Sequence, residues 1–511
     1  MQLPAFAFEP LSPISFLRRS GAVFSHRRAV VDGDISFTYG ELLDRCQRLA
    51  GALRARGLAP GDRVAVLMPN SHQMLEAHHG PAMAGLVLVP LNTRLAIAEH
   101  AAIIDASGAS LLLADDALLG HARAAAAAAA RDVTVVDMAT YEADLRSAVP
   151  LDEPVTDELA LLSLNYTSGT TGTPKGVMYH HRGAYLQAMA MIIHAKLDAS
   201  SRYLWTLPMF HCHGWMFPWS VTAVGGVHVC LRSLDPAEIW RQLDDGVTHL
   251  CAAPTVLTMM ATSPDAQLLG TRVHAITGGA PPTPAMLEEL GALGIDVHHS
   301  YGLTESFGPA MLCEWHPEWD ALPAAAQADL MARQGVGSLG GTQVRVLGND
   351  GLDVEADATT SGEIVLRGNA VMGGYLDAPD ATAAATTDDG WFRTGDVAVM
   401  HPDGYVEITD RAKDVIISGG ENISSVEVER VLVRHPAVLE AAVVGAHDAL
   451  WGERPVAFVT LRDGAAVTSD ELQAHVRAQL ARFKAPDTIT FGPLPKTSTG
   501  KVQKHVLRSR L

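Results

Sequence analysis

Cysteine is scarce in this 511-residue sequence, which contains five, and no two of them are spaced as CxxC. An odd number of widely separated thiols does not build a disulfide framework or a zinc ribbon, so we expect a reducing compartment, the cytoplasm. The sequence also lacks an apolar run of the roughly 18 residues that a membrane-spanning helix requires. We therefore expect no integral membrane segment.

Basic residues are outnumbered as well, because 38 Lys and Arg stand against 57 Asp and Glu, for a net charge of −19. Sequence-independent nucleic-acid binding needs a basic surface, so nucleic acid is not an expected partner. Apolar residues make up 48% of the chain. At this length a single hydrophobic core no longer grows, and at least two domains are expected.

Helical and strand patterns alternate along the chain. Apolar spacing predicts a helix over 41–57 and strands over 63–68 and 86–92, an alternation typical of layered α/β structure with parallel sheet. The alanine-rich stretch 121–132 is interpreted as a surface helix. A strand-rich section is predicted near 340–410, and a compact mixture of strands and helices follows it.

The stretch YTSGTTGTPKGV, residues 166–177, has the composition of a phosphate-binding loop. Glycines such as Gly169 and Gly172 allow backbone N–H groups to converge on phosphate oxygens, and Lys175 adds a positive charge. A P-loop of the GxxxxGK[ST] type is excluded, because Pro174 stands where the second glycine should be. The alternative is a flexible polar loop without a ligand.

Two other stretches match site patterns only superficially. In HCHG, the residues His211, Cys212 and His213 suggest zinc, but in a strand the two histidines would share one face and the cysteine would point away. The stretch GVGSLG, residues 335–340, fits GxGxxG. It does not follow a strand and open a helix, so we interpret it as a turn.

The loop at 166–177 closely resembles the phosphate loop of the adenylate-forming (AMP-binding) superfamily, which contains acyl-CoA synthetases, luciferases and the adenylation domains of peptide synthetases. Other stretches match that family in its own order: PMFHCHGW (208–215), ITGGAPP (276–282), HHSYGLTE (298–305), WFRTGD (391–396), DRAKDVIISGGENI (410–423) and PKTSTGKVQK (495–504). The resemblance runs from about residue 20 to 507.

The resemblance implies an α/β fold. A large N-terminal adenylation domain, residues 1–410, would contain two packed α/β sheets and a β-rich subdomain. A small mobile α+β C-terminal domain, residues 411–511, would turn about a hinge at Lys413. Some relatives carry a lysine four residues beyond the hinge, where this chain has Ile417.

The resemblance also assigns roles to residues. Catalytic roles fall on Lys501, His211, Thr304 and Glu305, and Mg²⁺ would bind Glu305 and Thr170. The implied ATP-binding residues are Thr167, Ser168, Gly169, Thr170, Thr171, Gly172, Lys175, Gly279, Ala280, His299, Ser300, Tyr301, Gly302, Asp396 and Arg411. The implied CoA-binding residues are Ser418, Gly419 and Gly420, and the implied acyl pocket contains Trp215, Gly278 and Gly308.

The implied reaction is activation of a small-molecule carboxylate by ATP and Mg²⁺ to an acyl-AMP, followed by transfer to coenzyme A. Trp215 and residues 314–335 resemble those of enzymes for medium- and long-chain fatty acids and related carboxylates, and the small residues Gly278, Gly279, Gly302 and Gly308 would leave room, so we expect a medium-chain, long-chain or bulky acyl group. Alternatives are an acyl-AMP ligase that passes its product to a carrier protein, a luciferase-like relative and a non-catalytic binding protein. A homodimer is left open.

Overall fold

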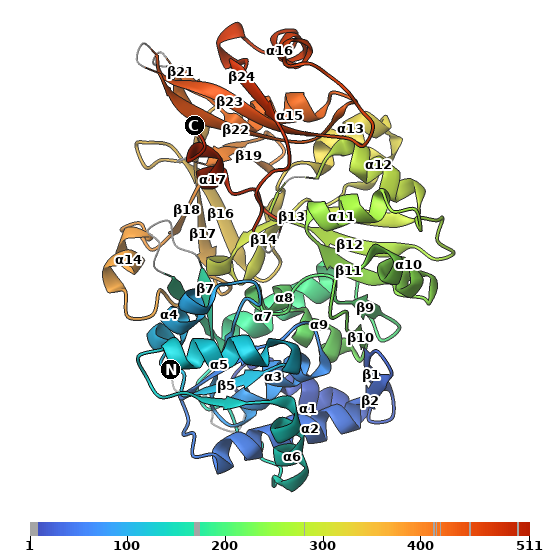
Figure 1. The fold of residues 1–511 in the computed structure, drawn as a ribbon, viewed down its shortest axis with the longest axis vertical. Coiled ribbons are helices and arrows are strands. Elements are labelled where there is room, and N and C mark those ends of the chain that lie inside the picture. Colours follow the sequence, from blue (N-terminus) through green and yellow to red (C-terminus); the bar gives the residue numbers. More distant parts are fainter. Residues whose placement is uncertain are drawn as a thin grey trace.

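The computed structural model describes residues 9–167, 174–280, 282–411, 414, 416–418, 421–448, 451–497 and 500–511. Four sheets organise the chain, and the helices lie on their faces (Figure 1). The predicted fold class, mixed α/β with a large N-terminal part and a smaller C-terminal part, is confirmed.

The first sheet has six strands in the order β6-β5-β3-β4-β7-β8 and is parallel except for the β7–β8 pair. Its strands are β3 (Arg63–Leu67), β4 (Val87–Pro90), β5 (Leu111–Ala114), β6 (Thr134–Val136), β7 (Leu161–Thr167) and β8 (Lys175–His180). Helices α2 (Tyr39–Ala55), α3 (His72–Met83) and α6 (Met138–Ser147) contribute to the core on one face, and α4 (Ile97–Ser107) and α5 (Leu119–Ala128) cover the other. The strands are apolar on both faces, as a covered parallel sheet requires.

The second sheet has nine strands in the order β15-β14-β13-β12-β11-β9-β10-β1-β2 and is parallel from β13 to β1. Its strands are β1 (Arg28–Asp32), β2 (Ile35–Thr38), β9 (Arg202–Leu204), β10 (Val227–Val229), β11 (His249–Ala252), β12 (Val273–Thr277), β13 (Ile295–Leu303), β14 (Gly308–Leu312) and β15 (Val336–Gly337). Helices α1 (Ile14–Val23), α7 (His181–His194) and α9 (Phe217–Val224) contribute to the core shared with the first sheet. Helices α10 (Pro236–Asp244), α11 (Pro254–Ala261) and α12 (Pro284–Ala292) cover the outer face.

The third sheet is antiparallel and corresponds to the predicted strand-rich section. It contains β16 (Thr342–Leu347), β17 (Ser361–Gly368), β18 (Phe392–Met400) and β19 (Val406–Arg411), in that order. Helix α13 (Ala324–Met331) precedes it, and α14 (Pro379–Ala384) lies between β17 and β18. Its core includes Tyr301 and Met311 of the second sheet, so the two sheets pack together.

The C-terminal elements form a separate sheet, drawn in orange and red at the top of Figure 1. It contains β20 (Ile416–Ser418), β21 (Glu421–Ile423), β22 (Val438–Asp448), β23 (Gly452–Leu461) and β24 (Thr488–Phe491). Helices α15 (Ser425–Val433) and α16 (Ser469–Arg477) bury its own core, and α17 (Lys504–Arg508) follows β24. Arg430 of α15 forms an ion pair with Glu407 of β19, so this unit contacts the third sheet.

The local predictions agree with these elements. The helix predicted over 41–57 is α2, which begins two residues earlier because Thr38 and Glu41 form a capping box. The alanine-rich helix is α5, with Ala122 and Ala125 buried against the sheet. The stretch 335–340 is not wholly a turn, since two of its residues form β15. Within the described ranges, no helix is long and apolar enough to cross a membrane.

Candidate active site

The predicted phosphate loop lies between two paired strands. Thr167 at the end of β7 pairs with Lys175 at the start of β8, and the two strands are antiparallel. Five of the predicted ATP-binding residues, Ser168, Gly169, Thr170, Thr171 and Gly172, lie outside the described residues, as does the predicted metal-ligand role of Thr170. Lys175 is therefore the positively charged residue of this stretch whose position the structure describes.

Tyr375, which lies in none of the motifs, contacts both this lysine and the predicted metal ligand Glu305. The Lys175 Nζ atom lies 4.9 Å from the centre of the Tyr375 ring, and the Tyr375 hydroxyl donates a hydrogen bond of 2.8 Å to Glu305 Oε1. Burial, and then the charge of Glu305, raises the pKa of Tyr375, so the phenol keeps its proton. One side chain thus contacts both charged groups.

Thr304, the neighbour of Glu305, is held from two other elements. The Tyr179 hydroxyl of β8 donates to the Thr304 carbonyl at 2.5 Å, and its ring stacks on Phe307 with the centroids 3.9 Å apart. The Cys212 thiol donates to Thr304 Oγ1 at 3.5 Å. Burial raises the pKa of Cys212 to about 12, so this thiol is protonated at neutral pH. Neither contact has a local sequence signal, because the partners are far apart in the chain.

Three of the predicted ATP-binding residues, Tyr301, Asp396 and Arg411, come from two different sheets. The Tyr301 hydroxyl of β13 donates to Asp396 Oδ2 of β18 at 2.5 Å. Asp396 in turn pairs with Arg411 in the β18–β19 ladder. The side chain of Arg411 lies outside what the structure describes. An aromatic face and a carboxylate are therefore neighbours, although 95 positions separate them in sequence.

Other predicted ATP-binding residues have backbone partners of their own. His299 is buried, its Nδ1 lies 2.8 Å from the Arg333 carbonyl, and burial lowers its pKa to about 4. The Ser300 hydroxyl donates to the Thr277 carbonyl at 2.9 Å. Gly279 and Ala280 are exposed just after β12. The side chains of His299 and Ser300 thus bond to backbone carbonyls of neighbouring segments.

The residues His211, Cys212 and His213 do not form a strand. The expectation that a strand would point Cys212 away from the two histidines is therefore wrong. The segment after β9 forms the short element α8 (Cys212–Trp215), in which φ is +46° at Cys212, +50° at His213, +52° at Gly214 and +57° at Trp215, and +69° at the following Met216. These are five consecutive residues in the left-handed region. Such a conformation costs about 1–2 kcal/mol at each non-glycine residue, so the surrounding structure must hold it.

The three predicted acyl-pocket residues are in contact. A Cβ on Gly278 would lie 3.1 Å from Trp215 Cη2, and a Cβ on Gly308 would lie 3.1 Å from Trp215 Cδ1. The indole thus lies against the end of β12 and the start of β14, and Trp215 is 8% exposed. We expected these glycines to leave room for an extended acyl chain. In the structure the Trp215 indole lies in the space beside Gly278 and Gly308, and Gly302 is packed against the Gly308 carbonyl.

The C-terminal lysine is close to this pocket. Burial, and then the positive charge of Lys501, lowers the pKa of His211 to about 4. His211 is therefore neutral at neutral pH, and Lys501 lies near enough to act on it. Gly500, at φ +82°, packs so closely on the Thr255 side chain at the start of α11 that a Cβ there would collide with it. The loop around Lys501 is thus docked on the large N-terminal part.

The predicted CoA-binding region is described only in part. Ser418 ends β20, is buried, and pairs with Glu421 and with Gly452 of β23. The predicted hinge Lys413 and the predicted CoA-loop residues Gly419 and Gly420 lie outside the described residues.

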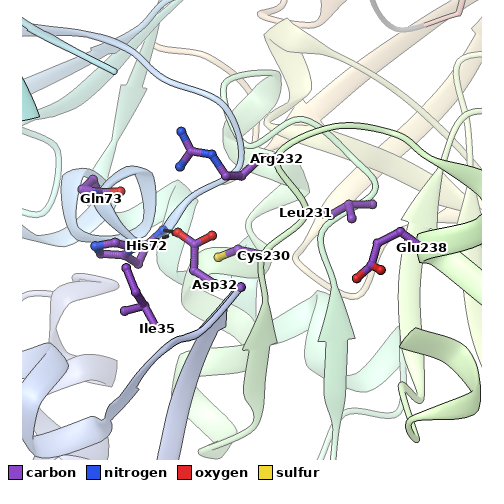
Figure 2. Close-up of a pocket in the computed structure, with 9 residues that line it drawn as sticks. Asp32, Ile35, His72, Gln73, Cys230, Leu231, Arg232 and Glu238 are labelled. Carbon is purple, nitrogen blue, oxygen red and sulfur yellow. Dashed lines mark hydrogen bonds and ion pairs between the residues drawn. The ribbon is translucent and has the colours of Figure 1, made fainter. Parts of the chain in front are cut away.

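A separate hollow of about 350 Å³ lies at the carboxyl ends of β1 and β10, beside the start of α3 (Figure 2). The charged side chains that line it form ion pairs with other residues of the chain. Asp32 pairs with His72 at 2.8 Å, Arg232 pairs with Asp115, and Glu238 pairs with Arg241 at 2.6 Å. This hollow is lined by the ends of β1 and β10 and by α3, and it shares no residue with the site above.

The chain belongs to the AMP-binding enzyme family. That family's model matches residues 17–376, and the model of the AMP-binding enzyme C-terminal domain matches residues 427–501. The prediction of an adenylate-forming enzyme, an acid–thiol ligase, is therefore confirmed at the level of the family.

Three relatives show how far the similarity extends. A peroxisomal acetate/butyrate–CoA ligase of Arabidopsis thaliana is 42% identical, over 98% of this chain and 95% of the relative. A 2-methylpropanoate–CoA ligase of Humulus lupulus is 43% identical over the same shares. The o-succinylbenzoate CoA synthetase of Bacillus subtilis, solved with ATP and a magnesium ion, is 28% identical with a TM-score of 0.84, over 97% of this chain and 98% of that one. That complex agrees with the predicted cofactors ATP and Mg²⁺.

Proposed function

We propose that the protein is a short-chain acyl-CoA synthetase, which activates a small straight or branched carboxylic acid with ATP and passes the acyl group to CoA. The observation that carries this proposal is the position of Trp215, whose indole fills the space beside Gly278 and Gly308. The acids in the names of the two plant relatives, acetate, butyrate and 2-methylpropanoate, point the same way. The proposal replaces our expectation of a medium-chain, long-chain or bulky acyl group.

In the first half-reaction, a carboxylate oxygen of the acid bonds to the α-phosphorus of ATP, and the bond to the bridging oxygen breaks to release pyrophosphate. Two anions must meet, so neutralising their charge is the main task of the site. Lys501 would contact the acid and the α-phosphate, Lys175 the outer phosphates, and Asp396 the ribose hydroxyls. His211 is neutral at neutral pH and would line the acyl site without adding charge.

The residues present fit a magnesium ion. Glu305 is half-buried and supplies the hard carboxylate oxygen that Mg²⁺ prefers, and its hydrogen-bond donor is the neutral Tyr375 hydroxyl. Mg²⁺ bound there would neutralise phosphate charge and hold the leaving group in place. Thr304, which is fixed beside Glu305, would donate a hydrogen bond from its hydroxyl to a phosphate oxygen.

In the second half-reaction, the sulfur of CoA bonds to the acyl carbon and the bond from that carbon to AMP breaks. We propose that the C-terminal unit, residues 411–511, turns about Lys413 between the two steps, withdraws Lys501 and brings Ser418 and its loop to the CoA thiol. The docked position of Gly500 against Thr255 corresponds to the first step. CoA, and not a carrier protein, is the acceptor we propose, and the five reduced cysteines support the cytoplasm as its location.

The test of this proposal is Trp215→Ala, assayed on a ladder of straight-chain acids from two to eight carbons with ATP, Mg²⁺ and CoA. We expect the wild type to prefer acids of about two to five carbons. Opening the pocket should raise kcat/KM for hexanoate relative to butyrate by about tenfold or more, since one methylene in an apolar pocket is worth roughly 10- to 200-fold. A wild type that prefers octanoate, or an unchanged ladder in the variant, would contradict the proposal.

A further inference from the structure

The left-handed turn Cys212–Met216 follows His211 directly and contains Trp215. The contacts that hold this turn therefore also set the positions of these two side chains. Residues in this region persist only where several contacts fix them. Gly214 contributes one such contact, since a Cβ there would lie 2.5 Å from Trp205 Cζ3. The middle of the turn therefore packs against Trp205, the residue after β9, with no space for a side chain.

His213 contributes the polar contacts. It is fully buried, and its Nε2 atom lies 2.6 Å from Ser163 Oγ and 2.7 Å from Asn165 Nδ2. The amide nitrogen of asparagine can only donate, so Nε2 accepts and carries no proton. Burial, and then the neighbouring His78, holds the pKa of His213 well below its ordinary value, which agrees with a neutral ring.

The two partners of His213 lie on one face of β7, two residues apart. This strand ends at Thr167 and leads directly into the phosphate loop. The imidazole is also surrounded by rings that leave it little freedom, at centroid distances of 5.1 Å to His78, 5.3 Å to Tyr179 and 5.3 Å to Trp219. His213 thus joins the wall of the acyl pocket to the strand that presents the phosphate loop.

We infer that His213 is a positioning residue for acyl-length discrimination. It fixes the left-handed turn through β7 and so keeps the Trp215 indole against Gly278 and Gly308. Without the acceptor at Nε2, the turn loses its polar anchor, the indole gains freedom, and longer acids enter. The inference rests on the proposed function, because it takes Trp215 as the residue that limits the length of the acid.

The test compares His213→Leu with His213→Gln on the same ladder of acids. Leucine removes the acceptor and leaves Ser163 and Asn165 without it, whereas the glutamine carboxamide places an oxygen near the position of Nε2. We expect His213→Leu to raise the hexanoate-to-butyrate ratio of kcat/KM by about tenfold. We expect His213→Gln to return that ratio most of the way to the wild-type value. The KM for butyrate should rise more than the KM for ATP.

The matched control is His249→Leu. His249 is a buried histidine at the start of β11, bonded to the Ala195 carbonyl at 3.0 Å and to Thr248 Oγ1 at 2.7 Å. The His249→Leu variant loses a comparable number of hydrogen bonds away from the acyl pocket. Its hexanoate-to-butyrate ratio of kcat/KM should therefore stay at the wild-type value, even if its melting temperature falls. If His213→Leu does not fold, the milder variant Ser163→Ala is tested instead. It should raise the hexanoate-to-butyrate ratio of kcat/KM by a smaller factor, and an unchanged ratio would overturn the inference.

Trp215→Ala in the same experiment separates the two proposals. If it admits hexanoate while His213→Leu leaves the ratio unchanged and only lowers stability, as His249→Leu does, the inference about His213 is overturned and the proposed function stands. If Trp215→Ala itself leaves the ratio unchanged, the proposed pocket is wrong and the inference falls with it.

Discussion

Tyr375→Phe should weaken the magnesium site while leaving the fold intact. The substitution removes one oxygen atom, the hydroxyl that donates to Glu305 Oε1 at 2.8 Å. It keeps the ring, over which the Lys175 ammonium lies 4.9 Å from the centroid. Any effect of the change therefore comes from the carboxylate, and Tyr375→Leu adds the loss of the ring for comparison.

The size of the effect follows from the kind of bond that is lost. A hydrogen bond to a charged group contributes about 1.5–3 kcal/mol, and groups that orient a metal-ligating carboxylate typically change metal affinity or activity by about 10- to 100-fold. We expect the apparent affinity for the divalent cation to fall by about tenfold or more. Tyr375→Leu should additionally raise the KM for ATP a few-fold, because Lys175 loses a cation–π contact.

The assay has two readouts. Electron paramagnetic resonance measures binding of Mn²⁺ in the presence of a non-hydrolysable ATP analogue, and pyrophosphate release measures the Mg²⁺ dependence of the first half-reaction. Tyr405→Phe is the control, since its hydroxyl donates to the Glu314 carbonyl at 2.7 Å and touches no predicted ligand. Equal Mn²⁺ binding in wild type and Tyr375→Phe would refute the assigned role of Tyr375.

Two further predictions concern the C-terminal loop and acid stability. Gly500→Ala should slow pyrophosphate release about tenfold, because its φ of +82° and its contact with Thr255 exclude a side chain; conversion of supplied acyl-AMP to the thioester should be unchanged, and a loss of both activities would contradict the docking argument. Burial lowers the pKa of His78 to about 4 and, together with His78, that of His228 to about 3, both from 6.5. The unfolded chain therefore binds more protons below pH 6.5, and stability should fall as the pH drops from 6.5 towards 4, by up to about 1.4 kcal/mol per pH unit for each histidine. Urea unfolding at pH 7, 6 and 5 checks this, with a smaller slope in His228→Gln; a flat free energy of unfolding would contradict it.

The parts of the fold that follow from local patterns could be predicted from the sequence. Helix α2 has apolar spacing and a capping box, and strands such as β3 are short apolar runs between helices. The motifs could be found for the same reason, because each is contiguous. Their assembly is visible only in three dimensions, as in the bond between Tyr301 and Asp396.

Three features of the site could not be predicted. Tyr375 lies in a loop without a helical or strand pattern, and its partner Glu305 is 70 positions away. The left-handed turn at Cys212–Met216 has one glycine and no other local signal, so an apolar context suggested a strand. The glycines at 278 and 308 indicated empty space, but whether a pocket is open depends on which side chain packs there, and here it is Trp215.

The central claim is that this enzyme joins short acids to CoA, and mass spectrometry of the wild-type products tests it most directly. The protein is incubated with ATP, Mg²⁺, CoA and equal concentrations of butyrate, 2-methylpropanoate and octanoate, and the CoA thioesters and AMP are measured. The account predicts butyryl-CoA or 2-methylpropanoyl-CoA in amounts equal to the AMP formed, and little octanoyl-CoA. Octanoyl-CoA as the main product, or acyl-AMP that accumulates without any thioester, would contradict it.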